Sequence, residues 1–251
     1  MITGAAICPP TPLLARELTG REPVVPELRQ ACAAAVERLV RSGPEVIAVV
    51  GPGHRTATWA AGGRLNLAGF APALGLRGGP RRSGPGRESG TGPVAGPRAG
   101  AGPSLPFAVG LGTRLLDEGG YRGPRLLRSV HHDEPAAGCL RLGADLGRLG
   151  DRVGLLVMAD GSARRSLRAP GYLDPREAAF DAALERAVRD GDLGPLRAMD
   201  QALARELLAA GRPGWQVLAG AMPGRAPTAE ILYADDPFGV FYLVAWLGGA
   251  A

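Results

Sequence analysis

Two short runs of apolar residues limit the possible folds of this chain more than any other part of its sequence. They read VIAVV at residues 46–50 and VGLLVMA at 153–159. A strand without a polar face is typical of a parallel sheet that is covered on both sides. The first run follows an apolar segment at 2–7 and a helical spacing of apolar residues at 26–42. Strand, helix and strand in this order predict a right-handed crossover between parallel strands.

The rest of the chain continues this alternation. The best-marked helix has Asp174 as its N-cap, Pro175 as its first residue and Glu177 completing a capping box. We therefore expect one α/β domain over residues 1–251, with a mostly parallel central sheet and helices on both faces. Further strands are predicted at 125–130, 229–233 and 239–246, and further helices at 105–118, 136–149, 193–210 and 214–222.

A segment at 77–104 interrupts the pattern. Between 78 and 103, more than half of the residues are glycine or proline, so the segment cannot bury enough apolar surface to order itself. We interpret it as a flexible, arginine-rich surface insertion, with a lid over a site as the alternative. Its five arginines account for most of the net charge of +5. Because the segment has no aromatic residue on which a base could stack, nucleic acid is not expected as a partner.

The amino-acid composition argues against several other mechanisms and cellular locations. The chain contains no lysine, which excludes a Schiff-base mechanism. Its three cysteines are widely spaced, as in a reduced, cytoplasmic protein without disulfides. No apolar run reaches the roughly 18–20 residues of a membrane span, and no secretory signal is recognisable. We expect a cytoplasmic protein that is not associated with a membrane, and a homodimer is the default oligomeric state.

The loops that follow the strands are where α/β proteins place their chemistry. An iron or zinc site needs about three His, Asp or Glu ligands. His54, Glu230 and His132 (or His131) are the candidates, although their spacing follows no fixed ligand motif. The alternatives are that His54 caps a strand-end turn and that His131–Glu134 is a solvated loop. In that loop, Asp133 would cap the following helix.

The loop after residues 153–159 contains a second set of candidate site residues: Asp160, Ser162, Arg164 and Arg165. Ser162 lacks the second glycine of a nucleophile elbow, so a serine hydrolase is not expected. The arginines, with Arg168, suit an anion clamp for a carboxylate. Surface pairing with Asp160 and Asp174 explains them equally well.

Five segments of the chain carry a recognisable combination of features: AAICPPTPLL, VIAVVGPGH, LLVMADGSARRSL, DPREAAFDAAL and ILYADDPFGVFYLVAW. Together they resemble the class III extradiol ring-cleavage dioxygenases, which share the fold of the β subunit of the protocatechuate ring-opening enzyme, and the likeness is to short actinobacterial members. The resemblance covers nearly the whole chain except 77–104. It implies that family's α/β fold, ferrous iron held by two histidines and a glutamate, cleavage of a catecholic ring, and a further acid–base histidine.

Position by position, the chain departs from this pattern. Pro10 occupies the place of the first histidine ligand, and His54 stands one residue after the place of the second, which is Gly53. Arg165 stands where the family has its acid–base histidine, and arginine stays protonated. Glu230 lies where the carboxylate ligand is expected.

Two functions remain open at this point. The first is an Fe(II)-dependent extradiol dioxygenase-like oxidoreductase with a degraded metal site, held by His54, Glu230 and His132. The second is a non-catalytic member that binds a small aromatic or carboxylated ligand, or a protein. The expected pocket is lined by Pro10, His54, Asp160, Ser162, Arg164, Arg165 and Asp235.

Overall fold

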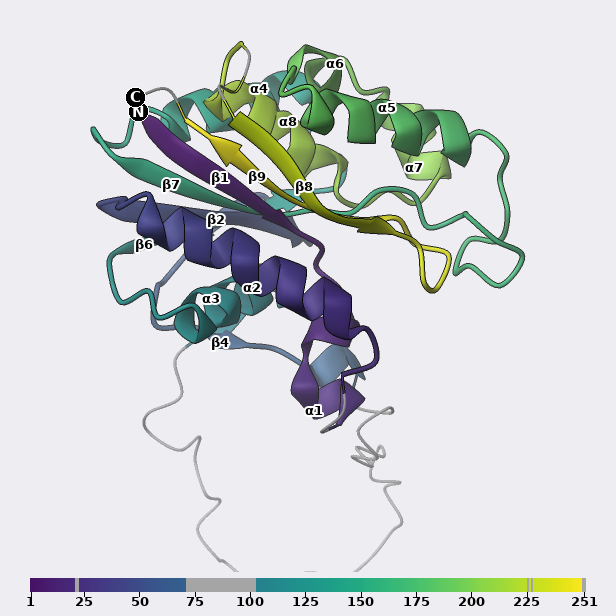
Figure 1. The fold of residues 1–251 in the computed structure, drawn as a ribbon, viewed down its shortest axis with the longest axis horizontal. Coiled ribbons are helices and arrows are strands. Elements are labelled where there is room, and N and C mark those ends of the chain that lie inside the picture. The colour runs from purple at the N-terminus through teal and green to yellow at the C-terminus, as the bar shows by residue number, and fades with distance from the viewer. Residues whose placement is uncertain (21–22, 71–102, 225, 227, 250–251) are drawn as a thin grey trace, which may run out of the picture.

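The computed structural model describes residues 1–20, 23–70, 103–224, 226 and 228–249 (Figure 1). The expected insertion at 77–104 lies outside the described residues, except for its last two. Among the described residues, no helix combines the length and the hydropathy needed to cross a membrane.

A seven-stranded sheet forms the centre of the fold, in the order β3-β6-β2-β7-β1-β9-β8. Its four inner strands β6, β2, β7 and β1 run parallel. Strands β3 and β9 are antiparallel to their inner neighbours, and β8 pairs antiparallel with β9. The strands are β1 (Ile2–Cys8), β2 (Val46–Gly53), β3 (Ala57–Trp59), β6 (Arg125–His131), β7 (Val153–Met158), β8 (Thr228–Asp235) and β9 (Tyr242–Gly248). A separate short pair joins β4 (Arg64–Leu65) to β5 (Ser104–Leu105).

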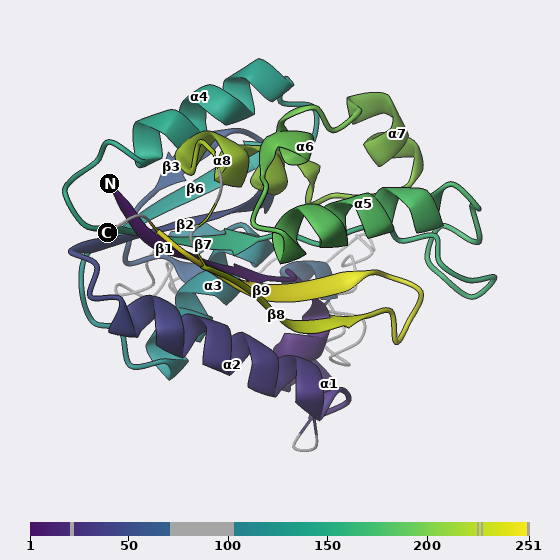
Figure 2. The ribbon, with the colours of Figure 1, turned by 45° about the horizontal axis from the view of Figure 1, so that its top comes forward.

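Helices cover both faces of the sheet (Figure 2). On one face lie α2 (Pro26–Arg41) and α3 (Phe107–Glu118). On the other face lie α4 (Ala136–Leu146), α5 (Glu177–Arg189), α6 (Gly194–Arg197) and α8 (Arg212–Ala221). The shorter α1 (Arg16–Thr19) follows β1, and α7 (Gln201–Glu206) lies beside α5 (Figure 1). This confirms the predicted α/β class.

The two apolar runs occupy the middle of the sheet, as expected. In β2, Ile47 and Val49 belong to the core under α2 and α3, whereas Ala48 and Val50 belong to the core under α4 and α8. Successive side chains of a strand point to opposite faces, so a strand buried on both faces must be apolar throughout.

Two of the differences between the predicted and the observed helices have a clear physical cause. Asp174 does not cap a helix; its Oδ1 accepts a hydrogen bond from the amide of Arg176, which makes a turn, and α5 begins only at Glu177. The helix expected at 193–210 is divided into α6 and α7. The reason is Asp200, whose side chain accepts from the amides of Ala202 and Leu203 and so starts a new helix.

Candidate functional site

The carboxyl ends of the parallel strands lie together at one edge of the sheet. The register sets Val50 beside Val157, and Val157 beside Ile7, while Gly53 at the end of β2 pairs with His131 at the end of β6. Residues that follow these strands therefore gather at this edge, where ligands of open α/β sheets are bound.

One cavity at this edge, the His54 cleft, opens beside the end of β2. Its volume is about 350 Å³, which is within the usual range of small-molecule sites. Three aromatic side chains contribute to its walls, and His54 and Arg55 contribute the ionisable groups. The lining residues are His54, Arg55, Trp59, Asn66, Gly69, Phe70, Ser104, Leu105, Pro106 and Phe107.

The Trp59 indole and the Arg55 backbone in the His54 cleft are held by the neighbouring strand β6. Ser129 of β6 is fully buried; its Oγ accepts from Trp59 Nε1 at 2.8 Å and donates to the carbonyl of Arg55 at 2.7 Å. The Arg55 guanidinium lies 5.1 Å from the centre of the Trp59 ring, in cation–π geometry. A Cβ at Gly53 would lie 2.7 Å from the Cβ of Ser129, so this approach of β2 to β6 requires glycine.

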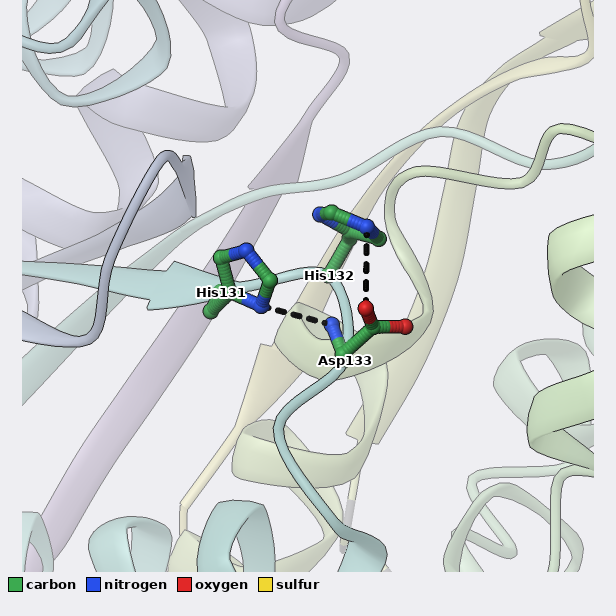
Figure 3. A group of neighbouring side chains, drawn as sticks. All are labelled: His131, His132 and Asp133. Carbon is green, nitrogen blue, oxygen red and sulfur yellow. Dashed lines mark hydrogen bonds and ion pairs between the residues drawn. The ribbon is translucent and has the colours of Figure 1, made fainter.

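A second group, the His131–Asp133 loop, begins at the last residue of β6. His132 Nε2 lies 3.2 Å from Asp133 Oδ2, and His131 Nδ1 accepts a hydrogen bond of 3.1 Å from the amide of Asp133 (Figure 3). The centres of the two imidazole rings are 4.1 Å apart. One ligand atom from each of the three residues lies within 4.8 Å of the other two.

The backbone of this loop is held by two neighbouring helices. The buried Arg212 of α8 donates to the carbonyl of His132 at 2.6 Å and to that of Glu134 at 2.8 Å. Gln201 of α7 donates to the carbonyl of Asp133 at 3.1 Å. Asp133 does not cap α4, whose N-cap is Pro135, and its carboxylate instead accepts from Arg205. The guanidinium of Arg205 holds the pKa of Asp133 below its usual range.

The set after β7 is organised around a buried carboxylate, Asp181 of α5. Asp181 has no exposed surface, and it accepts from the amide of Ser162 at 2.9 Å and from the Ser162 hydroxyl at 2.5 Å. Arg165 Nη1 lies 3.1 Å from Asp181 and 3.1 Å from Glu177, while Arg165 Nε donates to Asp236 at 2.8 Å. Arg165 is therefore occupied by three carboxylates rather than open to a ligand anion. Ser162 is fully buried, and Asp181 engages its hydroxyl.

Asp160 precedes this network and differs from it. Its Oδ1 is shielded from solvent and has no hydrogen-bond partner among the described residues. Burial of the carboxyl raises the pKa of Asp160 to about 7, and the negative charge of Asp181 adds to the shift. Asp160 is thus a carboxyl group that exchanges a proton near neutral pH.

The three ligands expected for iron do not come together. Glu230 of β8 binds Arg38 of α2 through two hydrogen bonds, at 2.5 and 3.0 Å. Four strand intervals separate β8 from β2, which is roughly 19 Å at the usual spacing. Among the described residues, the group of converging donors contains His132 but neither His54 nor Glu230.

The structure also gives the surroundings of three further residues of the expected pocket. Asp235 is exposed, and its Oδ1 accepts from the amide of Asp236. Arg164 is half-buried, and its carbonyl accepts from the amide of Asp174. Pro10 is half-buried after the end of β1.

Sequence reasoning missed four members of the His54 cleft: Arg55, Trp59, Phe70 and Phe107. Arg55 and Trp59 lie within five residues of His54, so an aromatic and a cation close to a strand-end histidine were the available signal. Phe107 had no such signal, because only the packing of α3 against β2 brings it to this edge.

Comparisons with known proteins support the fold and leave the function open. No family model matches the sequence, and no curated protein matches it. The structure is similar to that of an uncharacterized protein, JW3007, from Escherichia coli K12, with a TM-score of 0.53 and 17% sequence identity. The match covers 98% of this chain and 100% of the E. coli chain. At this identity the likeness concerns the arrangement of helices and strands alone.

Proposed function

We propose that the protein is a non-catalytic, extradiol dioxygenase-like protein that binds a small aromatic carboxylate in the His54 cleft. The observation that carries the proposal is the lining of that one cavity, which combines aromatic rings with a guanidinium and an imidazole. Apolar walls with a few convergent polar groups are typical of a small-molecule site.

The fixed position of Trp59 and Arg55 supports this ligand class. The indole is held by Ser129, and the guanidinium lies over the indole ring. A stacked arginine keeps the N–H groups at its edge available, and that edge matches a carboxylate in two parallel hydrogen bonds. Phe70 and Phe107, with ring centres 5.0 Å apart, offer a surface for an aromatic ring.

The alternative is Fe(II)-dependent ring cleavage with His54, His132 and Glu230 as ligands. The residues do not fit this iron site, because Glu230 is paired with Arg38 on the α2 side of the sheet. Arg165 cannot serve as an acid–base group near neutral pH, and three carboxylates surround it. We therefore derive no catalytic step through iron.

Four probe molecules test separately whether the aromatic ring and the carboxylate of the proposed ligand contribute to binding. Benzoate and 4-hydroxybenzoate carry both a ring and a carboxylate, catechol lacks the carboxylate, and cyclohexanecarboxylate lacks the aromatic ring. Calorimetric titration is expected to show the tightest binding for the two aromatic acids. Equal affinity for all four probes would contradict the proposal.

Two variants assign the binding to the His54 cleft. Arg55→Met is expected to weaken benzoate binding about tenfold, which corresponds to one charge-assisted hydrogen-bonded pair, and to leave catechol binding nearly unchanged. Trp59→Leu is expected to weaken both. Arg64→Met is the matched control, because Arg64 is an exposed arginine that lines a different hollow. If the protein formed a ring-opened product from catechol in the presence of Fe(II) and oxygen, the proposal of a non-catalytic binding protein would be wrong and the dioxygenase would be supported.

A further inference from the structure

We propose that the His131–Asp133 loop binds one divalent transition-metal ion of the zinc or cobalt type. The ligands are the two imidazoles and the carboxylate of Asp133. This site shares His132 with the ligand set that the sequence suggested for iron, but it uses neither His54 nor Glu230. It does not depend on what the His54 cleft binds.

The separation of two of the donor atoms, those of His132 and Asp133, fits a shared ion. Metal bonds of about 2.0–2.2 Å, meeting at angles between about 90° and 109°, set two donor atoms roughly 3.0–3.4 Å apart. His132 Nε2 and Asp133 Oδ2 are 3.2 Å apart, and the third donor lies within 4.8 Å of both. An ion placed between His132 and Asp133 therefore needs little movement of either side chain.

The third donor comes from His131, at the cost of one hydrogen bond. His131 Nδ1 accepts from the amide of Asp133 at 3.1 Å, so its lone pair already faces the loop. Binding through this atom exchanges that bond for a metal bond and requires the imidazole to rotate away from the amide of Asp133. We expect His132 and Asp133 to be the essential ligands and His131 to strengthen the site.

The loop is organised before any ion arrives. Arg212 is buried and binds two of the loop carbonyls, and Gln201 binds a third. In addition, the hydroxyl of Thr56 accepts from the amide of His131 at 3.1 Å and donates to Glu134 at 2.6 Å. Because the backbone is already fixed, an ion does not have to order the loop when it binds.

Arg205 is the cation that competes for this site. Its guanidinium donates to Asp133 Oδ1, and the Arg205 side chain is 60% exposed. An exposed arginine leaves such a pair at little cost because water solvates both partners, so a doubly charged ion can displace it. Loss of this positively charged residue is therefore expected to strengthen cation binding.

The test is a titration of the full-length protein with Zn²⁺ by calorimetry and with Co²⁺ by visible absorption. The chain has only three histidines, and its three cysteines are buried, so few other sites compete. We expect one equivalent of each ion to bind. Binding is expected to release protons and to weaken on acidification, because histidine coordinates only in its neutral form.

The variants are expected to change the affinity for Zn²⁺ in opposite directions. His132→Ala and Asp133→Asn are expected to lower Zn²⁺ affinity by at least about tenfold, and His131→Ala by less. Arg205→Met is expected to raise affinity by up to about fivefold, the equivalent of one surface ion pair. A gain of affinity cannot come from misfolding, so this variant guards against loss of structure. His54→Ala is the matched control and is expected to bind Zn²⁺ like the wild type.

Three results would overturn the proposal. They are the absence of stoichiometric binding of either ion, binding that His132→Ala leaves intact, and binding that is lost equally in His54→Ala. Any of them would show that the two imidazoles and the carboxylate are brought together by the fold without forming a metal centre.

Discussion

Arg165 Nη1 lies 3.1 Å from Oδ2 of Asp181, a carboxylate without exposed surface. This contact joins the loop after β7 to α5, and the bond from Arg165 to Asp236 extends it to the hairpin between β8 and β9. Burial raises the pKa of Asp181, and the hydrogen bonds from Ser162 and the charge of Arg165 oppose that shift. Arg165 therefore compensates buried negative charge, which is a structural role.

Removal of Arg165 is expected to destabilise the fold strongly. Arg165→Met leaves three carboxylates close together, and breaking a buried ion pair costs about 3–5 kcal/mol. Because Arg165 is partly exposed, we expect a loss near the lower end, about 3 kcal/mol, in urea unfolding. Arg168→Met, in an exposed arginine of the same loop, is the control and is expected to change stability by less than about 0.5 kcal/mol. Equal losses in the two variants would contradict the structural role.

Asp160 makes the stability of the protein depend on pH in a defined window. Its folded pKa is about 7, against about 3.9 for an unfolded aspartate, so the folded state binds more protons between these values. The contribution of Asp160 to stability is then fully present below about pH 4 and falls as pH rises towards 7. Asp160→Asn removes this loss. As the pH is raised from about 5 to about 8, we expect the free energy of unfolding of the variant to increase by on the order of a few kcal/mol relative to that of the wild type.

The measurement is urea unfolding of both proteins at several pH values in that window. Asp181 and Glu177 also have pKa values raised by burial. Both are present in the two proteins, so their own contributions cancel in the difference except for the smaller coupling between Asp181 and Asp160. Asp174 has its pKa lowered to about 2 by Arg176, so it titrates below the window. A difference between the two proteins that stays constant across the whole window would show that Asp160 ionises normally.

The contact between α4 and α8 depends on glycine. A Cβ at Gly220 would lie 2.3 Å from the carbonyl oxygen of Leu140, and one at Gly143 would lie 2.1 Å from that of Val217. These neighbours are backbone atoms and cannot rotate away. Gly220→Ala is therefore expected to cost at least about 2 kcal/mol in chemical unfolding. Gly62→Ala, at an exposed position with no atom within 4 Å, is expected to cost less than about 0.5 kcal/mol.

Glu230 is predicted to contribute only to a surface ion pair with Arg38. Both side chains are substantially exposed, at 50% and 33%, so a double-mutant cycle of Glu230→Gln and Arg38→Gln is expected to give a coupling below about 1 kcal/mol. The Glu230→Gln variant should also bind Zn²⁺ and benzoate as the wild type does. If this variant lost the ability to bind metal, Glu230 would have to be a metal ligand and the prediction would be wrong.

Local sequence pattern was enough to predict the layers of this protein. VIAVV and VGLLVMA have no polar face, and an apolar strand must be covered on both sides, so the parallel centre of the sheet and its two helical layers followed from that pattern. The strand ends were also predictable, and with them the positions of His54 and His131–Asp133 at the carboxyl edge.

The pairing of side chains, in contrast, depended on how distant segments fold against one another. Arg165 was expected either to clamp an anion or to pair with Asp160 and Asp174, but it binds Asp181. Glu230 was expected to be a metal ligand, but Arg38, distant in the chain, binds it. Conversely, Phe107 joins Trp59 in the His54 cleft because α3 packs beside β2. The hydrophobic pattern is a local property, because it repeats with the period of a strand or a helix. Charge pairing depends instead on which distant segments come into contact, and the hydrophobic pattern does not specify those contacts.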